Sequence, residues 1–144
     1  MKKLFTIDPN PTNIDLALLV ARVGVSASML THGLPKLMML FGEGPVQFPG
    51  VLGMGPELSL VLAVFAEVLC VIFVLVGLGT RLASIPIIVT MVIAVFLIHA
   101  ADPFAVKEMG LLYLLAYVVF FLVGSGKYSV DALLVKRQKA LVTA

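Results

Sequence analysis

Hydrophobic residues fall into four long runs, separated by short segments rich in Gly, Pro and charged residues. Each run is close to the roughly 20 residues that an α-helix, rising 1.5 Å per residue, needs to cross a bilayer. The pattern therefore predicts an all-α protein with a polytopic, antiparallel bundle of four transmembrane helices, because short connections make consecutive helices run in opposite directions. The predicted helices cover residues 13–40, 57–77, 81–100 and 106–122.

The residues between the runs indicate why each helix begins and ends. Asn13 is expected to cap the first helix, and three prolines exclude a helix from most of residues 42–56. Gly77 and Gly79 provide a helix stop and a flexible turn before Thr80, which is expected to cap the third helix. Pro103 ends that helix, because proline disfavours helical geometry in the residue before it. Tight antiparallel connections follow from these turns.

A shorter segment follows the fourth run, over about residues 129–141. Ser129 is a suitable N-terminal cap, and the hydrophobic residues of the segment share a side with basic residues nearby. This pattern is typical of a helix that lies on a membrane surface, with its apolar side in the lipid and its charges in the headgroups. We therefore predict a short amphipathic C-terminal helix.

The composition supports a membrane protein. Hydrophobic residues make up 61% of the 144-residue chain and charged residues 12%, against about 25% charged residues in soluble domains. The mean hydropathy is +1.15. The runs follow one another so closely that residues 1–144 are expected to form a single domain. The net charge is only +2, and the basic residues do not cluster as they do in proteins that bind nucleic acid. The lipid bilayer is therefore the expected partner, and nucleic acid is not.

Lys and Arg residues are distributed unequally between the two predicted sides of the membrane. Lys36 and Lys107 fall on one side. The other side carries Lys2, Lys3, Arg81, Lys127, Lys136, Arg137 and Lys139. Because cytoplasmic segments are enriched in basic residues, we predict a multi-pass protein of the cell inner (plasma) membrane with both termini in the cytoplasm. The amino end is predicted to be a short cytoplasmic lead, since Asp8 and Pro9 interrupt any signal-like hydrophobic region.

Two charged residues are predicted to lie deep in the bilayer. Arg22 is about nine residues into the first predicted helix and Glu67 about ten residues into the second, so both are expected roughly 14–15 Å from opposite boundaries. An isolated charge at that depth costs about 2.5–3.5 kcal/mol to insert. Pairing Arg22 with Glu67 would remove most of this cost. The pair is open to two interpretations, a purely structural link between helices or the centre of a binding pocket.

Further polar residues extend from this predicted pair towards the outer surface. Ser26 follows Arg22 at helical spacing, and His32 and Lys36 continue the same path. Gly33 allows close backbone approach at that end. This polar stripe favours a pocket that opens outwards, because a structural link alone would not need it.

The third and fourth predicted helices contribute candidates near the same level. His99 ends the third helix and Glu108 begins the fourth, which makes proton exchange with the exterior conceivable there. Tyr113 and Tyr117 continue an aromatic line along the fourth helix. For the two tyrosines ordinary bundle packing is an open alternative, and for His99 and Glu108 so is simple exposure to headgroups.

Several short motifs agree in order and spacing with one family. They are Arg22-Val23-Gly24, His32-Gly33-Leu34-Pro35-Lys36-Leu37, Glu67, Gly77-Leu78-Gly79-Thr80-Arg81, and Gly124-Ser125-Gly126-Lys127-Tyr128-Ser129-Val130-Asp131. On these motifs the chain resembles the DoxX family of small four-helix membrane proteins. The resemblance implies a bacterial-type inner-membrane protein linked to respiratory or redox chemistry, since the family is named for a subunit associated with thiosulfate:quinone oxidoreductase. It supports Arg22, His32, Lys36, Glu67 and Arg81 as motif positions.

These observations lead to three hypotheses. The preferred one is a redox-associated subunit that binds a quinone or similar lipophilic molecule between its helices, together with a membrane or peripheral redox partner protein. With a single cysteine, Cys70, and no metal or flavin motif, the chain is expected to have no cofactor of its own, so electron transfer would have to borrow one. The alternatives are a non-enzymatic scaffold or assembly partner and, less favoured, a small transporter of an anionic solute. Whether the chain is an enzyme by itself, and whether it forms a homo-oligomer, stay open.

Overall fold

The computed structural model describes residues 11–142 and contains helices and connections, with no strand in that range. The predicted amino-terminal lead, with Lys2 and Lys3, lies outside the described residues. The elements are α1 (Pro11–Phe41), α2 (Pro56–Val64), η2 (Phe65–Cys70), α3 (Val71–Val76), α4 (Thr80–Ile93), η3 (Ala94–Ile98), α5 (Phe104–Val123) and α6 (Val130–Val142). The all-α prediction is confirmed.

Four helices are long and apolar enough to cross a membrane, as predicted. The second and third each combine α-helical and π-helical parts. The spans are α1, α2–η2–α3 (Pro56–Val76), α4–η3 (Thr80–Ile98) and α5. Their ends lie within two residues of the predicted ends. The protein is therefore a multi-pass membrane protein.

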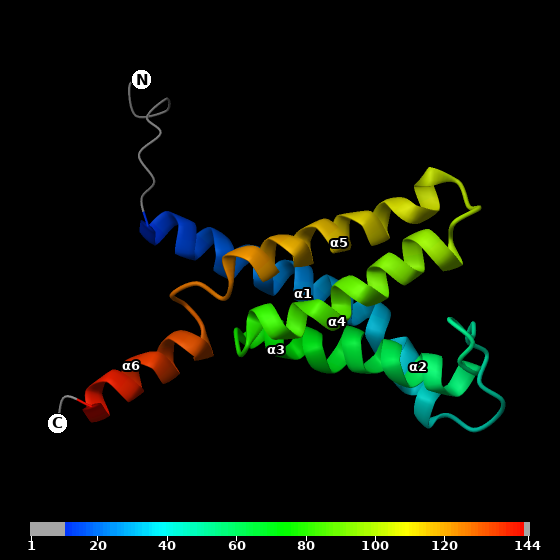
Figure 1. Ribbon diagram of the computed structural model, residues 1–144, viewed down its shortest axis with the longest axis horizontal. Coiled ribbons are helices and arrows are strands. Elements are labelled where there is room, and N and C mark those ends of the chain that lie inside the picture. Colours follow the sequence, from blue (N-terminus) through cyan, green and yellow to red (C-terminus); the bar gives the residue numbers. More distant parts are fainter. Residues whose placement is uncertain (1–10, 143–144) are drawn as a thin grey trace, which may run out of the picture.

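The four spans pack as a bundle (Figure 1). α1 contacts α2, η2 and α3 along its length, and α4 packs chiefly against α5. The centre of the core is formed by fully buried side chains of Met29, Val71, Val74, Ile87 and Tyr117. Large apolar side chains also cover the outside of the spans, as expected where the solvent is lipid. We call the end of the bundle with the 42–55 connection the loop end, and the opposite end, with the 77–79 turn, the turn end.

The turn between α3 and α4 depends on glycine. Gly77 has a φ of 75°, in the left-handed region that glycine adopts without steric cost. This conformation lets the amide groups of Gly77 and Leu78 both donate to the carbonyl oxygen of Phe73, which closes the helix. The predicted helix stop is therefore confirmed.

Two of the three predicted caps are wrong. Asn13 lies inside α1, which begins at Pro11, and Thr80 is the first residue of α4 after Gly79, with no side-chain cap. Ser129 does cap α6, since its Oγ accepts a hydrogen bond from the amide of Ala132 at 3.2 Å. Pro11 is compatible with the first turn of a helix, because the amide hydrogen that proline lacks has no partner there.

α6 projects away from the four spans (Figure 1). It is joined to the turn end through Asp131, whose amide donates to the carbonyl oxygen of Gly77 at 3.0 Å. The carboxylate of Asp131 accepts the amide of Gly79 at 2.9 and 3.1 Å. Leu133, Leu134 and Leu141 remain exposed on α6, so the described residues leave its apolar side uncovered.

Candidate functional site

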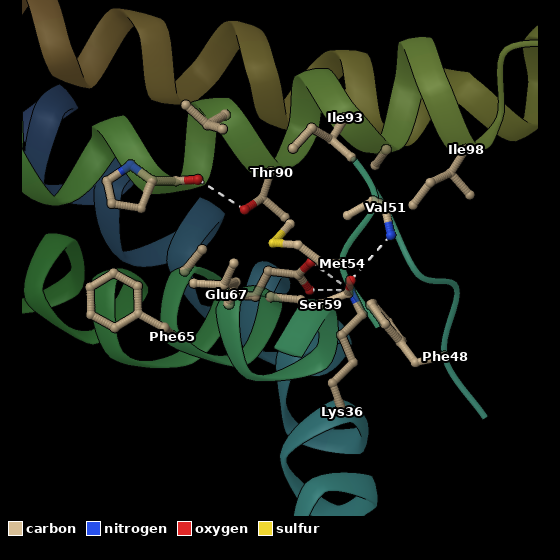
Figure 2. Close-up of a pocket in the computed structure, with 16 residues that line it drawn as sticks. Lys36, Phe48, Val51, Met54, Ser59, Phe65, Glu67, Thr90, Ile93 and Ile98 are labelled. Carbon is tan, nitrogen blue, oxygen red and sulfur yellow. Dashed lines mark hydrogen bonds and ion pairs between the residues drawn. The ribbon is translucent and has the colours of Figure 1, made fainter. Parts of the chain in front are cut away.

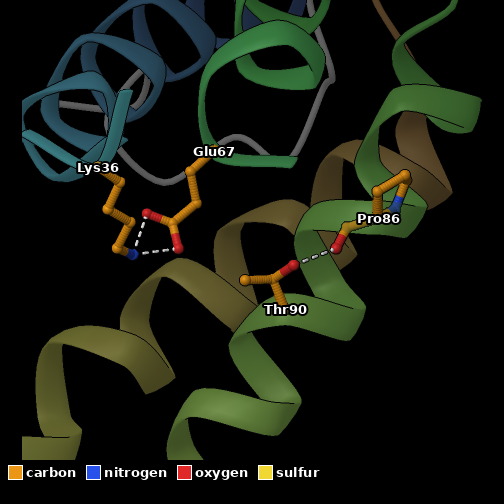
Figure 3. Close-up of polar contacts among 4 residues, drawn as sticks. All are labelled: Lys36, Glu67, Pro86 and Thr90. Atoms are coloured by element: carbon orange, nitrogen blue, oxygen red, sulfur yellow. Dashed lines mark hydrogen bonds and ion pairs between the residues drawn. The ribbon is translucent and has the colours of Figure 1, made fainter. Parts of the chain in front are cut away.

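A buried ion pair lies towards the loop end of the bundle. The Nζ atom of Lys36, near the end of α1, is 2.5 Å from both carboxylate oxygens of Glu67 (Figure 3). The side chain of Glu67 is 2% exposed and that of Lys36 is 28% exposed. A carboxylate so deeply buried needs a cation beside it, because its desolvation would otherwise be very costly.

The backbone around Glu67 explains how the pair forms. Glu67 lies in η2, a π-helical segment inside the second span, and such segments are frequent at functional sites. Gly33 of α1 packs directly on it, since a Cβ atom added to Gly33 would lie 2.5 Å from the carbonyl oxygen of Glu67. The missing side chain therefore lets α1 and η2 approach closely. Lys36 follows Gly33 by about one helical turn and reaches the carboxylate.

The ion pair forms part of the wall of a cavity of about 240 Å³, which we call the lateral cavity (Figure 2). The cavity lies between α2–η2, α4–η3 and the 42–55 connection. Most of its lining is apolar, and the polar side chains other than the ion pair are Ser59 and Thr90. The Phe48 ring flanks the site, with its centroid 6.0 Å from the Nζ atom of Lys36.

The two hydroxyl groups are held by backbone hydrogen bonds. The Ser59 Oγ atom accepts the amide of Val51 at 3.1 Å, which ties the 42–55 connection to α2 and leaves the hydroxyl hydrogen unused by that bond. The Thr90 Oγ1 atom donates to the carbonyl oxygen of Pro86 at 2.9 Å and keeps lone pairs for accepting (Figure 3). Together with Lys36, these groups offer both donors and acceptors to a ligand.

The lateral cavity reaches the lipid-facing surface of the bundle. Three of its lining residues, Leu62, Phe65 and Val89, are 45%, 44% and 51% exposed on the outside of the second and third spans. A molecule dissolved in the bilayer could therefore enter between these spans without passing through water.

A second cavity, of about 200 Å³, lies on the other side of the same ion pair, and we call it the polar cavity. It shares Lys36, Glu67 and Ala94 with the lateral cavity. Its remaining polar lining consists of His32, His99, Lys107 and Tyr113. The structure thus brings together five of the predicted site residues, Lys36, Glu67, His32, His99 and Tyr113.

One ring contact and one contact between a histidine and a carboxylate involve side chains that line the polar cavity. His32 and Tyr113 meet edge to face, with ring centroids 5.6 Å apart. The Nδ1 atom of His99 lies 2.7 Å from the Oδ2 atom of Asp102, and both side chains are more than 40% exposed. His99 therefore marks the aqueous side of the cavity.

Arg22 is not paired with Glu67, and the predicted ion pair is wrong. Its Nη1 atom donates to the carbonyl oxygen of Ser125, and its Nη2 atom donates to that of Tyr128 at 2.7 Å. The prediction took Asn13 as the membrane boundary. However, α1 has 31 residues and is about 47 Å long, which exceeds the roughly 30 Å of hydrocarbon. Arg22 consequently lies near the turn end, where it joins the 124–129 segment to the bundle.

The predicted candidates Ser26 and Tyr117 lie in the core between Arg22 and the ion pair. Both are 0% exposed. The Tyr117 ring packs edge to face on Phe120. These residues line neither cavity, which agrees with the alternative that Tyr117 serves bundle packing.

Two other candidates lie outside the site. Arg81 is exposed at the turn end, where its Nη2 atom donates to the carbonyl oxygen of Leu122 at 3.2 Å. Glu108 is exposed at the start of α5 and lines neither cavity. Counting residues placed Glu108 at the correct level, but it did not reveal on which side of α5 the carboxylate lies.

Four polar or aromatic residues that line the cavities were not among the predicted site residues, namely Phe48, Ser59, Thr90 and Lys107. A hydroxyl three residues into a helix is an ordinary feature, so Ser59 carried no distinguishing signal. Phe48 is an aromatic residue in a segment rich in Gly and Pro, and this pattern does not by itself indicate a binding site. Only the folding of the 42–55 connection over α2 places this ring beside Lys36.

Comparison with known protein families shows to which family this arrangement of residues belongs. The family model described as DoxX matches residues 17–100. The chain belongs to the DoxX family. The match runs from α1 to the turn after η3. It includes Lys36, Glu67 and every other residue that lines the lateral cavity of this DoxX protein, while Tyr113 of the polar cavity lies beyond it. Searches of curated proteins and of solved structures gave no significant match.

Proposed function

We propose that this DoxX protein binds a quinone, or a similar lipophilic molecule with a polar ring, in the lateral cavity. The observation that carries the proposal is the Lys36–Glu67 pair in the wall of an apolar cavity whose rim faces the lipid. Ligand sites of this kind are mostly hydrophobic and use a few polar groups to orient the ligand. A volume of about 240 Å³ suits one substituted ring, with its hydrocarbon tail left among the lipids.

The polar groups supply the contacts that a quinone ring requires. The ammonium group of Lys36 has three N–H donors, and two of them suffice for the two oxygens of Glu67. The third is free to donate to a carbonyl oxygen of the ligand, and the hydroxyl hydrogen of Ser59 can donate to a second polar group. The Phe48 ring offers a stacking surface beside Lys36. Arg22 takes no part in these contacts, because it binds carbonyl oxygens of the 124–129 segment towards the other end of the bundle.

Ligand extraction and thermal unfolding test this proposal. Purified protein should release a quinone into organic solvent, and added quinone should raise its melting temperature, since a ligand at 100 times its Kd stabilises by about 2.7 kcal/mol. Lys36→Met should remove this response. Lys107→Met is the matched control, because Lys107 lines the polar cavity but not the lateral cavity. No extracted quinone and no thermal response in the parent protein would contradict the proposal.

We further propose that the chain acts as a redox-associated subunit and borrows its electron donor from a membrane or peripheral partner protein. A quinone bound between helices is reduced only if an electron donor reaches it, and on this proposal the partner protein holds that donor. Protein purified alone should therefore bind quinone without reducing it. Reduction should appear when the partner is restored.

A non-enzymatic scaffold is the second candidate, and α6 is the observation that favours it. α6 projects from the bundle, with exposed leucines and the basic residues Lys136 and Arg137. Such a helix could lie on the lipid surface or receive another protein. The double variant Lys136→Gln/Arg137→Gln should lose a copurifying partner if α6 holds it. Unchanged copurification would count against the scaffold, and quinone binding should be unaffected either way.

We propose that the turn end faces the cytoplasm of a bacterial-type inner membrane, in keeping with the distribution of basic residues. Cys70 is the sole cysteine and is buried, so a Cys70→Ala background permits site-specific labelling. A cysteine at position 107 should react with an impermeant thiol reagent in intact cells, whereas one at position 127 should react only after lysis. The reverse pattern would contradict this orientation.

A further inference from the structure

The Lys36–Glu67 pair separates two cavities of different character. Apart from the pair itself, the lateral cavity has no titratable side chain in its lining among residues 11–142. The polar cavity carries two histidines, a lysine and a tyrosine. The ion pair is therefore reached from the lipid on one side and by a chain of titratable groups on the other.

The groups that face Glu67 come from several elements. α1 contributes Lys36 in direct contact, and Tyr113 of α5 lines the same cavity. The third span contributes Met91, Ala94 and Val95 there, none of which titrates. The polar cavity is also lined by His32 of α1, by His99 after η3 and by Lys107 of α5.

These groups range from exposed histidines to a buried tyrosine and a buried carboxylate. His99 and its partner Asp102 are 41% and 46% exposed, Tyr113 is 8% exposed and Glu67 is 2% exposed. A cavity of about 200 Å³ has room for several water molecules, each of which occupies about 30 Å³ in the liquid. Water held between imidazole, phenol and carboxylate groups can pass protons along hydrogen bonds.

We infer that the polar cavity is the route by which Glu67 exchanges protons with the aqueous phase at the loop end. In the inward direction a proton moves from an imidazolium group or a cavity water to a carboxylate oxygen of Glu67, and the donor regains a proton from bulk water beside His99. Protonation neutralises Glu67 and weakens its bond to Lys36, which leaves more of the ammonium group for a ligand carbonyl. The inference rests on the proposed function for its purpose, because the ligand would occupy the lateral cavity while protons arrive from the opposite side.

Two matched valine variants separate the two cavities. Val106 lines only the polar cavity and Val51 only the lateral cavity, and both lie near the loop end. Val106→Trp should fill the polar cavity, and Val51→Trp the lateral one. The measurement is time-resolved infrared spectroscopy on protein in lipid nanodiscs after a pH jump, without any quinone. The Glu67 carboxyl band is assigned by its absence in Glu67→Gln.

Val106→Trp should slow the response of the Glu67 band by about tenfold, which corresponds to ~1.4 kcal/mol in the barrier, while Val51→Trp should leave it unchanged. His32→Phe, which removes a titratable ring and keeps an aromatic one, should slow the response in the same direction. Unaltered rates in both Val106→Trp and His32→Phe would overturn the inference, as would slowing by Val51→Trp alone. Circular dichroism and melting temperature identify any variant that fails to fold, and His99→Asn then serves in its place.

The proposed function is tested separately on the same samples. Quinone binding, measured as a shift in melting temperature, should be weakened by Val51→Trp and retained by Val106→Trp. If no quinone binds but Val106→Trp slows proton exchange of Glu67, the proposed quinone binding is refuted and the proton route is supported. Retained quinone binding together with unaltered exchange would refute the proton route alone.

Discussion

Removing Lys36 should destabilise this protein more than removing Glu67. Lys36→Met leaves the Glu67 carboxylate 2% exposed and without a cation, whereas Glu67→Gln leaves a lysine that is 28% exposed. The flexible lysine stem can carry its ammonium group towards the nearby aqueous surface, but the carboxylate is fixed in η2 and has no such route. The two single variants therefore test whether burial controls the cost.

The magnitude follows from the energetics of buried ion pairs. Removing one partner of such a pair typically costs about 3–5 kcal/mol, and we expect Lys36→Met to fall in that range. At roughly 2–4 °C per kcal/mol for a chain of this size, the melting temperature should fall by about 6–20 °C. Glu67→Gln should cost less, about 1–2 kcal/mol, since it removes the pair but leaves no buried charge. The double variant Lys36→Met/Glu67→Gln should be close to the Glu67→Gln variant, because both charges are gone.

The assay is thermal unfolding followed by circular dichroism, in one detergent and at one protein concentration for all four proteins. The coupling between the two sites, calculated as a double-mutant cycle, should reach about 3–5 kcal/mol, because the double variant is expected to lack the whole cost of Lys36→Met. Additive effects of the two substitutions would refute the pair as a stabilising contact. A larger fall in melting temperature for Glu67→Gln than for Lys36→Met would refute the argument that burial of the remaining charge controls the cost.

Three further predictions use substitutions at close contacts, all measured by thermal unfolding. Gly33→Ala should lower the free energy of unfolding by about 1–3 kcal/mol, because the new Cβ would lie 2.5 Å from a backbone carbonyl oxygen. Gly24→Ala is the control and should be neutral or slightly stabilising, since its Cβ would have nothing within 4 Å. Equal effects of the two substitutions would contradict the close approach of α1 and η2. Gly77→Ala should lower the free energy of unfolding more than Gly79→Ala. Both glycines have a positive φ, but only a Cβ at position 77 would meet the Arg22 guanidinium and Ser129. A larger loss at Gly79 would contradict this packing. Arg22→Met should lower the free energy of unfolding by about 1.5–3 kcal/mol, because charged hydrogen bonds to two carbonyl groups are lost. The same loss should make the 124–129 segment more sensitive to protease. Unchanged cleavage would show that these hydrogen bonds do not hold the segment against the bundle.

The pattern of hydrophobic runs determined the four spans and their ends. Helices in lipid must satisfy their own backbone hydrogen bonds, so long apolar runs leave the chain little choice of structure. Gly77 and Ser129 also acted as predicted, because a left-handed helix stop and a serine cap depend on residues within a few positions. The family motifs between Arg22 and Arg81 likewise lie within the match to DoxX over residues 17–100, whereas the motif at residues 124–131 lies outside it.

Which charges meet was decided only by the tertiary structure. The sequence identified Glu67 as a buried group that needs a cation, but it offered both Arg22 and Lys36 on one helix, and residue counting chose the wrong one. The outcome depends on how far α1 extends beyond the bilayer and on the close contact of Gly33 with the Glu67 backbone. Both are properties of packing between helices, whereas hydropathy reports only that each helix lies in the membrane. Pairing between distant residues therefore required the folded bundle.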